Sequence, residues 1–220
     1  MNNEIEVQRN FWNSEADAFE RIYSHEKSKL STFLDRVFRK DMYERFVFTI
    51  RNCEPVAGRT FLDVGCGNGL YSVELAKKGA SRVVGLDISP VMIGRCQQSA
   101  RKEGLEDQLT FVQTDLLEYE PESSFDVSYG IGLFDYISDP APVLKKMREV
   151  TKDRAIMAFP RFWTWRAPVR KARLTMKGCP VFFYTKARID RLMKDAGFAS
   201  WEVTRVGKLH CVVAKSGDKA

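Results

Sequence analysis

The chain has 220 residues, of which 44% are hydrophobic and 29% are charged. This balance is typical of one folded domain of ordinary size and excludes a chain that is mainly disordered. The 35 basic and 29 acidic residues give a formal net charge of +6. The distribution of charge along the chain is therefore more informative than its total.

The five cysteines are scattered and contain no C-x-x-C spacing; they are Cys53, Cys66, Cys96, Cys179 and Cys211. This pattern excludes a disulfide framework or a zinc cluster, predicts no bound metal and favours a reducing compartment. The first ten residues lack the bases and apolar run of a signal peptide. No uncharged apolar stretch approaches the ~20 residues that cross a bilayer. We therefore expect a cytoplasmic protein, with peripheral contact with a membrane left open.

The first fifty residues carry apolar side chains at three- and four-residue steps, which predicts helix. After a break at Pro55 to Gly58, short strands and helices alternate. The predicted strands are 60–64, 81–87, 108–113, 125–129 and 155–159, and the predicted helices are 69–79, one that begins at Ser89-Pro90, and 140–151. This alternation is typical of a parallel sheet that helices cover on both faces.

The end of the chain predicts one more helix and a strand pair. The helix spans 186–196 and ends at Gly197, and the strands span 201–206 and 209–214. Only Gly207-Lys208 separates the two strands, which favours a hairpin. One strand of the pair is therefore expected to run antiparallel to the rest of the sheet.

The segment Leu62-Asp-Val-Gly-Cys-Gly-Asn-Gly69 joins the first predicted strand to the next helix. Ligands of open parallel sheets bind at the carboxyl ends of the strands, where glycine permits a sharp turn and direct ligand contact. Leu70 stands where a dinucleotide-binding G-x-G-x-x-G motif requires its third glycine, and the Gly-Lys-Ser/Thr of a phosphate loop is missing. The loop therefore predicts a different nucleotide-like ligand.

Three acids accompany this loop. Asp87 ends the second strand, where a carboxylate can accept hydrogen bonds from both ribose hydroxyls. Asp115 ends the third strand, where it can accept from an exocyclic amine such as that of adenine, or cap the next helix. Asp63 lies inside an apolar strand and needs a partner, such as loop N–H groups or a ligand ammonium.

Segments 62–69, 84–89 and 111–115 together resemble successive motifs of the class I S-adenosylmethionine-dependent methyltransferases, and 125–130 resembles the fourth strand of that family. The resemblance covers residues 60–160 and the last thirty residues. It implies a Rossmann-like α/β fold with a seven-stranded, mostly parallel sheet whose last strand is antiparallel. It also implies S-adenosyl-L-methionine as the cofactor.

The same resemblance implies the cofactor-binding residues. Gly65, Gly67 and Gly69 would line the methionine portion, and Gly130 would lie beside the methyl group. Asp63 would hold the amino group, Asp87 the ribose and Asp115 the adenine amine. The whole predicted set is Tyr23, Asp63, Gly65, Cys66, Gly67, Gly69, Asp87, Ile88, Asp115, Leu116 and Gly130.

We expect a single methyltransferase domain over residues 1–220. Within it, 1–54 would form a helical lid, 59–160 the cofactor-binding core, 161–184 a basic aromatic acceptor cap, and 185–220 the closing helix and strand pair. The start of the chain is similar to the lid helix of small-molecule members, and Tyr23 is its expected cofactor contact. The segment Phe19-Glu-Arg-Ile-Tyr23 also resembles porphyrin-carboxylate methyltransferases, but it is too short to name a substrate.

Methyl transfer is an in-line displacement in which positioning supplies much of the catalysis, and a lid that excludes water assists it. A base is optional when the acceptor is already acidic. The candidate catalytic residues are His25, Asp135 and Tyr136, although the last two could equally cap the next helix. His210 lies in the closing strand pair and is interpreted as structural.

The chain's excess positive charge is concentrated between Arg154 and Ile189, a stretch that has nine bases and no acid. Candidate acceptor-binding residues there are Arg161, Trp165, Arg166 and Arg170. They could clamp a carboxylate or phosphate, lie on an anionic membrane or bind RNA. The stretch could also be a solvated basic face over a packed aromatic core.

We therefore predict methyl transfer to a small acceptor that is anionic or lipid-linked, at oxygen. Nucleic acid is not the expected partner, because the segment Tyr129-Gly-Ile-Gly132 lacks the Asn/Asp-Pro-Pro-aromatic signature of amino-directed nucleic-acid methylation. Two alternatives stay open: an RNA methyltransferase, and a non-catalytic cofactor-binding subunit that regulates a partner or docks on a membrane. The sequence predicts no oligomeric state.

Overall fold

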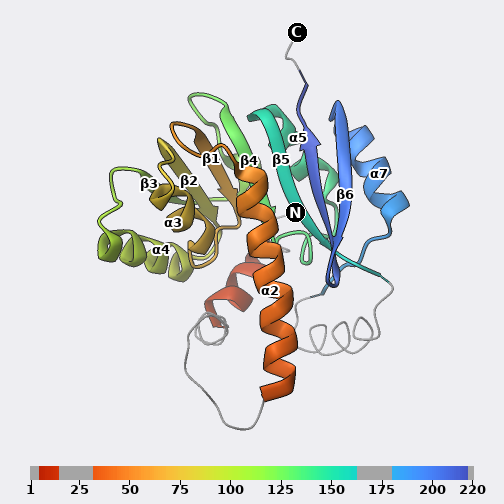
Figure 1. Ribbon diagram of the computed structural model, residues 1–220, viewed down its shortest axis with the longest axis horizontal. Helices are drawn as coiled ribbons and strands as arrows, with labels where there is room; N and C mark the ends of the chain where they lie inside the picture. The colour runs from red at the N-terminus through yellow and green to blue at the C-terminus, as the bar shows by residue number, and fades with distance from the viewer. Residues whose placement is uncertain (1–4, 15–31, 163–179, 218–220) are drawn as a thin grey trace.

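The computed structural model describes residues 5–14, 32–162 and 180–217, with the backbone alone for 32–39. Its centre is a seven-stranded sheet in the order β3-β2-β1-β4-β5-β7-β6, with helices on both faces (Figure 1). The strands are β1 Thr60–Val64, β2 Arg82–Asp87, β3 Leu109–Gln113, β4 Phe125–Ile131, β5 Thr151–Pro160, β6 Ser200–Val206 and β7 Leu209–Lys215.

Residues 5–14 form the first helix. The others are α2 Thr32–Cys53, α3 Leu70–Lys77, α4 Pro90–Glu103, the 3-10 helix η1 Leu116–Glu118, α5 Ala141–Glu149 and α7 Lys186–Asp195. The predicted start of α4 is confirmed, because Ser89 precedes Pro90 and its Oγ accepts from the N–H of Met92 at 3.2 Å. Strand β5 is longer than predicted at both ends.

The strand directions confirm the predicted sheet. Strands β1 to β5 pair in parallel, whereas β7 runs antiparallel to both β5 and β6. Strand β1 lies between β2 and β4, so the chain changes direction across the sheet at this point. In sheets of this kind the ligand crevice lies outside the carboxyl ends of the strands that flank such a switch.

The core has two layers, one on each face of the sheet. Phe61 and Leu62 are neighbours on β1 and both are fully buried, but successive strand residues point to opposite faces. Leu62 packs in one cluster with Leu144 of α5, and Phe61 packs in the other with Leu75 of α3 and Ile50 of α2. Both faces of the strands are therefore apolar, which is typical of parallel sheets.

Figure 1 shows α2 as a long rod that crosses one face of the sheet and extends past the strand ends. At its middle, the carboxylate of Asp41 forms an ion pair with Lys208 in the β6–β7 turn. Near its end, the carbonyl of Asn52 accepts from Arg154 Nη1 at 3.3 Å. The second half of α2 is thus fixed to the sheet at two points. In the described part of the chain, no helix has the length and apolar character that a membrane crossing requires.

Candidate functional site

The loop between β1 and α3 follows the strand at the topological switch. Gly65, Gly67 and Gly69 have φ angles of 73°, 55° and 76°, in the left-handed region that glycine adopts at little cost. The N–H groups of Gly65 and Cys66 donate to the carbonyl of Leu86 at 2.8 and 2.9 Å. The loop therefore folds back on the end of β2, with its backbone at the carboxyl edge of the sheet.

Asp87 at the end of β2 fixes this loop. Its Oδ2 accepts from the N–H of Gly67 and its Oδ1 from the N–H of Ser89, each at 2.9 Å. Burial raises the pKa of Asp87 to about 6, although these backbone hydrogen bonds act in the opposite direction. Each carboxylate oxygen has two lone pairs, so Asp87 can still accept from hydroxyl groups of a ligand.

Asp63 lies behind the loop and is only 2% exposed. Its Oδ2 accepts from Ser72 Oγ of α3 at 2.7 Å, and that hydroxyl lies 3.5 Å from the Tyr129 hydroxyl of β4. Burial raises the pKa of Asp63 to about 7. A nearby cation would favour the charged carboxylate, so the site suits a ligand ammonium group.

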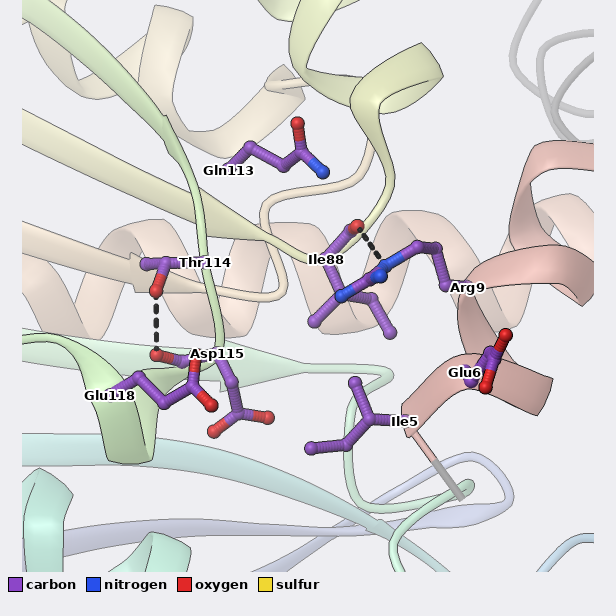
Figure 2. A pocket seen from close by; sticks show the side chains of 8 residues that line it. All are labelled: Ile5, Glu6, Arg9, Ile88, Gln113, Thr114, Asp115 and Glu118. Carbon is purple, nitrogen blue, oxygen red and sulfur yellow. Dashed lines mark hydrogen bonds between the residues drawn. The ribbon is translucent and has the colours of Figure 1, made fainter. Parts of the chain in front are cut away.

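A cleft of about 440 Å³ lies beyond the ends of β2 and β3, and Figure 2 shows the side chains that line it. The strand side contributes Ile88, Gln113, Thr114, Asp115 and Glu118, and the first helix contributes Ile5, Glu6 and Arg9. Oδ1 of Asp115 accepts from the N–H of Leu117 at 2.7 Å. Asp115 therefore caps η1 and lines the cleft at the same time, which combines the two roles considered for it from the sequence.

The helix over residues 5–14 lies over the ends of β2 and β4. Arg9 Nε donates to the carbonyl of Ile88 at 3.2 Å, and Gln8 Nε2 donates to that of Tyr136 at 2.7 Å. The rings of Trp12 and Tyr136 meet edge to face at 5.0 Å, and Asn13 Oδ1 accepts from the hydroxyl of Ser89 at 2.6 Å. This helix thus contacts the neighbours of both predicted cofactor and predicted catalytic residues.

The sequence predicts a helical lid over residues 1–54 with its cofactor contact at Tyr23, but it does not single out residues 5–14 as a wall of the cleft. The signal was present in the aromatic pair Phe11-Trp12, which belongs to the apolar pattern of the first fifty residues. Tyr23 and His25 both fall outside the described residues. Among the described residues of the N-terminal segment, residues 5–14 are therefore those that contact the cleft.

The segment after β4 holds three further predicted residues. A Cβ on Gly130 would lie 3.4 Å from both Leu133 Cδ2 and Phe134 Cε2, so this backbone lies directly against side chains of the segment that follows. Asp135 is 6% exposed, and its carbonyl accepts from the N–H of Phe182 at 2.8 Å. Tyr136 faces Trp12. Asp135 and Tyr136 thus lie at the same edge as the glycine loop.

The remaining predicted residues occupy different places. Leu116 is buried in η1 below the cleft. Cys66 is buried with its sulfur 3.8 Å from that of Cys96. Arg161 follows β5, and its Nη1 donates to the carbonyl of Gly207 at 3.3 Å. The other acceptor-cap candidates, Trp165, Arg166 and Arg170, lie outside the described residues.

This set of carboxylates and apolar groups fits an adenosyl sulfonium with a methionine tail. Asp87 offers acceptors for ribose hydroxyls, and the cleft beside Ile88 and Asp115 offers an apolar side chain and a carboxylate for a base with an exocyclic amine. Asp63 offers a buried carboxylate behind the glycine loop for an ammonium group. The features suited to the base, the ribose and the ammonium group lie at β3, β2 and β1, which are neighbours in that order in the sheet, as such a ligand requires.

Residues 55–197 match the family model described as a methyltransferase domain. Sterol 24-C-methyltransferase ERG6B of Gibberella zeae is 30% identical over 155 residues, which cover 70% of this chain and 41% of that protein. Ubiquinone biosynthesis O-methyltransferase of Nitrosococcus oceani is 32% identical over 103 residues, which cover 47% of this chain and 43% of that protein. The chain thus matches less than half the length of these curated relatives.

A similar solved structure is that of magnesium protoporphyrin IX methyltransferase from Synechocystis PCC 6803 with bound SAH. It has a TM-score of 0.76 at 22% identity and covers 96% of this chain and 99% of that one. This likeness supports the fold, and the family model matches well over half of the chain. The protein therefore belongs to the class I S-adenosylmethionine-dependent methyltransferase family.

Proposed function

We propose that this protein transfers the methyl group of S-adenosylmethionine to an oxygen atom of a small acceptor that is anionic or lipid-linked. The observation that carries the proposal is the hydrogen bond between the Gly67 N–H and the Asp87 carboxylate. It joins the glycine loop to the acid that suits a ribose, at the switch point of the sheet. The cofactor would supply an activated methyl group on a positively charged sulfur.

In this proposal each part of the site holds one part of the cofactor. Asp87 accepts from the ribose hydroxyls, and Ile88 and Asp115 hold the adenine in the cleft. Asp63 offsets the charge of the amino group from behind the loop. Gly130, at the end of β4 with Leu133 and Phe134 packed against its backbone, would lie beside the methyl group.

In this reaction no side chain of the protein forms a covalent bond with the methyl group. A bond forms between the acceptor oxygen and the methyl carbon while the bond from that carbon to sulfur breaks. The acceptor proton leaves before or during this step, and His25, Asp135 and Tyr136 are the candidates to receive it. An acceptor that is already ionised needs no such base, and positioning then supplies most of the rate enhancement.

The first helix acts as a cover in this proposal. Its contacts with Ile88, Ser89 and Tyr136 hold it over the cleft. A cover that excludes water favours a reaction in which an anion and a sulfonium lose their charges. Cofactor and product must pass this helix, so its opening would limit their exchange.

One relative's name supports oxygen as the methylated atom, whereas the sterol relative is named a 24-C-methyltransferase, and the chain's charge supports a negative group on the acceptor. The ubiquinone relative is named an O-methyltransferase, and the other two proteins are named for a sterol and for magnesium protoporphyrin IX. All three names refer to large organic acceptors. The stretch from Arg154 to Ile189 contains nine bases and no acid, which favours an acceptor with a negative group.

A panel of acceptors tests this proposal. The full chain is incubated with S-adenosylmethionine and, separately, with carboxylates, phenols, lipid-linked sugars and RNA, and the release of S-adenosylhomocysteine is measured. We expect turnover with an anionic or lipid-linked compound and a methylated oxygen in the product. Turnover with RNA alone would establish the RNA alternative instead. Tight binding of S-adenosylhomocysteine without turnover on any acceptor would support the non-catalytic alternative.

A further inference from the structure

Two arginines and a histidine lie at the carboxyl edge of the sheet, on the face that α5 and α7 cover. Arg161 follows β5, Arg205 lies near the end of β6, and His210 lies near the start of β7. His210 is the register partner of Arg205 on one side and of Phe159 on the other. Paired residues share a face of a sheet, and alternation places Arg161, two residues after Phe159, on that same face.

No carboxylate of the described residues pairs with these three side chains. Arg161 Nη1 donates to the carbonyl of Gly207. The acid that faces His210 is Asp190 of α7, which already accepts from Lys186 Nζ at 2.7 Å and from Trp201 Nε1 at 2.9 Å. The chain that links β5 to α7 contains no acid either. Two acids of α2, Asp41 and Glu44, lie beside Gly207 in the adjoining turn, and Asp41 pairs with Lys208. Among the described residues, the two arginines therefore have no carboxylate partner of their own.

Burial and the neighbouring charges both act on the pKa of His210. Burial lowers the pKa of His210 from 6.5, and the charges of Arg161, Arg205 and Lys186 lower it further, whereas Asp190 acts in the opposite direction. Burial and Arg205 also lower the pKa of Arg161. Helix α7 begins beside them, and the partial positive charge of a helix N-terminus adds to theirs.

We propose that Arg161, Arg205 and His210 form an oxyanion site that binds the phosphate or carboxylate group of the acceptor. This inference rests on the proposed function, because it assigns a place to the negative group of that acceptor. Two arginine forks suit a phosphate or carboxylate, and a neutral imidazole can donate one further hydrogen bond. His210 is then a ligand-binding residue and not the structural one expected from the sequence.

The sheet order also sets a length for the acceptor. Strand β7 lies two strands from β4, and β6 lies three. Arg161 follows β5, the strand next to β4, so at ~4.8 Å per strand the three residues of the anion site lie about 5–14 Å from the end of β4, where the methyl group would lie. The acceptor is therefore expected to carry its negative group about 5–14 Å from the methylated oxygen.

Proton uptake follows from the same arrangement. In the free protein the lowered pKa keeps His210 neutral at pH 7. A bound dianion offsets the charges of Arg161, Arg205 and Lys186 and favours the protonated imidazole. Asp190 favours that form as well. Anion binding therefore takes up a proton and becomes tighter as the pH falls toward the pKa of His210 in the complex.

An NMR titration of the full chain with inorganic phosphate tests the site. The chain has two histidines, so the signal that is lost in His210→Gln identifies His210. We expect phosphate to shift this signal saturably, with at least tenfold weaker binding in Arg205→Gln and unchanged binding in Arg101→Gln, an exposed site on α4. A shift that sodium chloride of equal ionic strength reproduces, or equal binding by both arginine variants, would overturn the proposal.

Two further measurements distinguish a lipid headgroup from a soluble anion as the ligand, and test the anion site separately from the methyltransferase proposal. Vesicles of phosphatidylcholine with phosphatidylglycerol that bind wild type but not Arg205→Gln would support the site with a lipid headgroup as its ligand. Binding of soluble phosphate without vesicle binding would support it with a soluble acceptor. Binding of S-adenosylhomocysteine in the same samples tests the methyltransferase proposal separately. If it binds and neither anion does, the anion site alone is rejected.

Discussion

The carboxylate of Asp87 accepts a hydrogen bond from the backbone N–H of Gly67 at 2.9 Å. These two residues belong to different strand ends, so one side chain sets the position of the whole loop between β1 and α3. The second oxygen of the same carboxylate accepts from Ser89, which caps α4. Asp87 therefore links the ligand-binding loop, β2 and α4 at one point.

Replacement of Asp87 with alanine should weaken the binding of S-adenosylhomocysteine at least tenfold. The change removes the acceptor for the ribose and the hydrogen bond that fixes the loop, and hydrogen bonds to charged groups contribute about 1.5–3 kcal/mol each. Isothermal titration calorimetry measures the effect. Asp107→Ala, at an exposed position before β3, is the matched control. Equal affinities of the two variants would remove the ribose assignment.

The stability of the ligand-free protein should fall as the pH rises from about 4 to 7. Asp63 has its pKa raised from 3.8 to about 7, so the folded state keeps a proton that the unfolded state releases in this range. A shift of about three units corresponds to about 4 kcal/mol, an order-of-magnitude figure. Asp63→Asn should remove much of this pH dependence in urea titrations. Parallel curves for the variant and wild type would contradict the prediction.

Asp126 provides a control of opposite sign. Burial acts to raise its pKa, but the N–H and Oγ1 of Thr60 both donate to it at 2.8 Å and lower it overall. Its stabilising effect is present above the unfolded pKa and is lost as the pH falls through the folded one. Asp126→Asn should therefore destabilise the protein at neutral pH and have a diminishing effect in acid.

Two glycine-to-alanine changes should act in opposite directions. A Cβ on Gly85 in β2 would lie 2.7 Å from Cδ1 of Phe111, whereas a Cβ on Gly94 in α4 would meet nothing within 4 Å. Gly85→Ala should destabilise the fold by about 1–3 kcal/mol through overpacking. Gly94→Ala should stabilise it by about 0.5–1 kcal/mol, because alanine favours helix. Urea denaturation of both variants checks these signs.

Loss of the Trp12 ring should open the cover without unfolding the protein. Its edge-to-face contact with Tyr136 is of a kind that contributes about 0.5–1.5 kcal/mol. Trp12→Ala should therefore speed the dissociation of S-adenosylhomocysteine about twofold to tenfold, with little change in Tm. Stopped-flow displacement measures the rate. The control is Val7→Ala on the same helix, where Val7 is 40% exposed, and an equal effect of that variant would refute a specific role for Trp12.

The strands were predictable because their residues combine a local pattern with clear boundaries. Gly65 and Gly79 mark the ends of β1 and α3, and Ser89-Pro90 marks the start of α4. The structure confirms the closing hairpin as well, since Gly207-Lys208 is the turn between β6 and β7. In each case the signal lies within a few residues of the feature that it predicts.

The cleft and the basic cluster could not be predicted in the same way. Arg9 lines the cleft next to Ile88 because the first helix lies over a strand end 79 residues further along the chain. Arg205 and His210 meet Arg161 because β7 inserts between β5 and β6. Such proximities depend on tertiary packing, and no periodicity or motif in a single sequence records them.

The ion pair between Asp41 and Lys208 joins residues that are 167 positions apart. A ribosome therefore releases α2 long before the turn between β6 and β7 exists. During synthesis the second half of this helix can already pack against β1 and α3 through Ile50, but Asp41 at its middle has no Lys208 to pair with until the last two strands have emerged. The side of the sheet formed by β7 and β6 is thus completed after the side that carries Asp87.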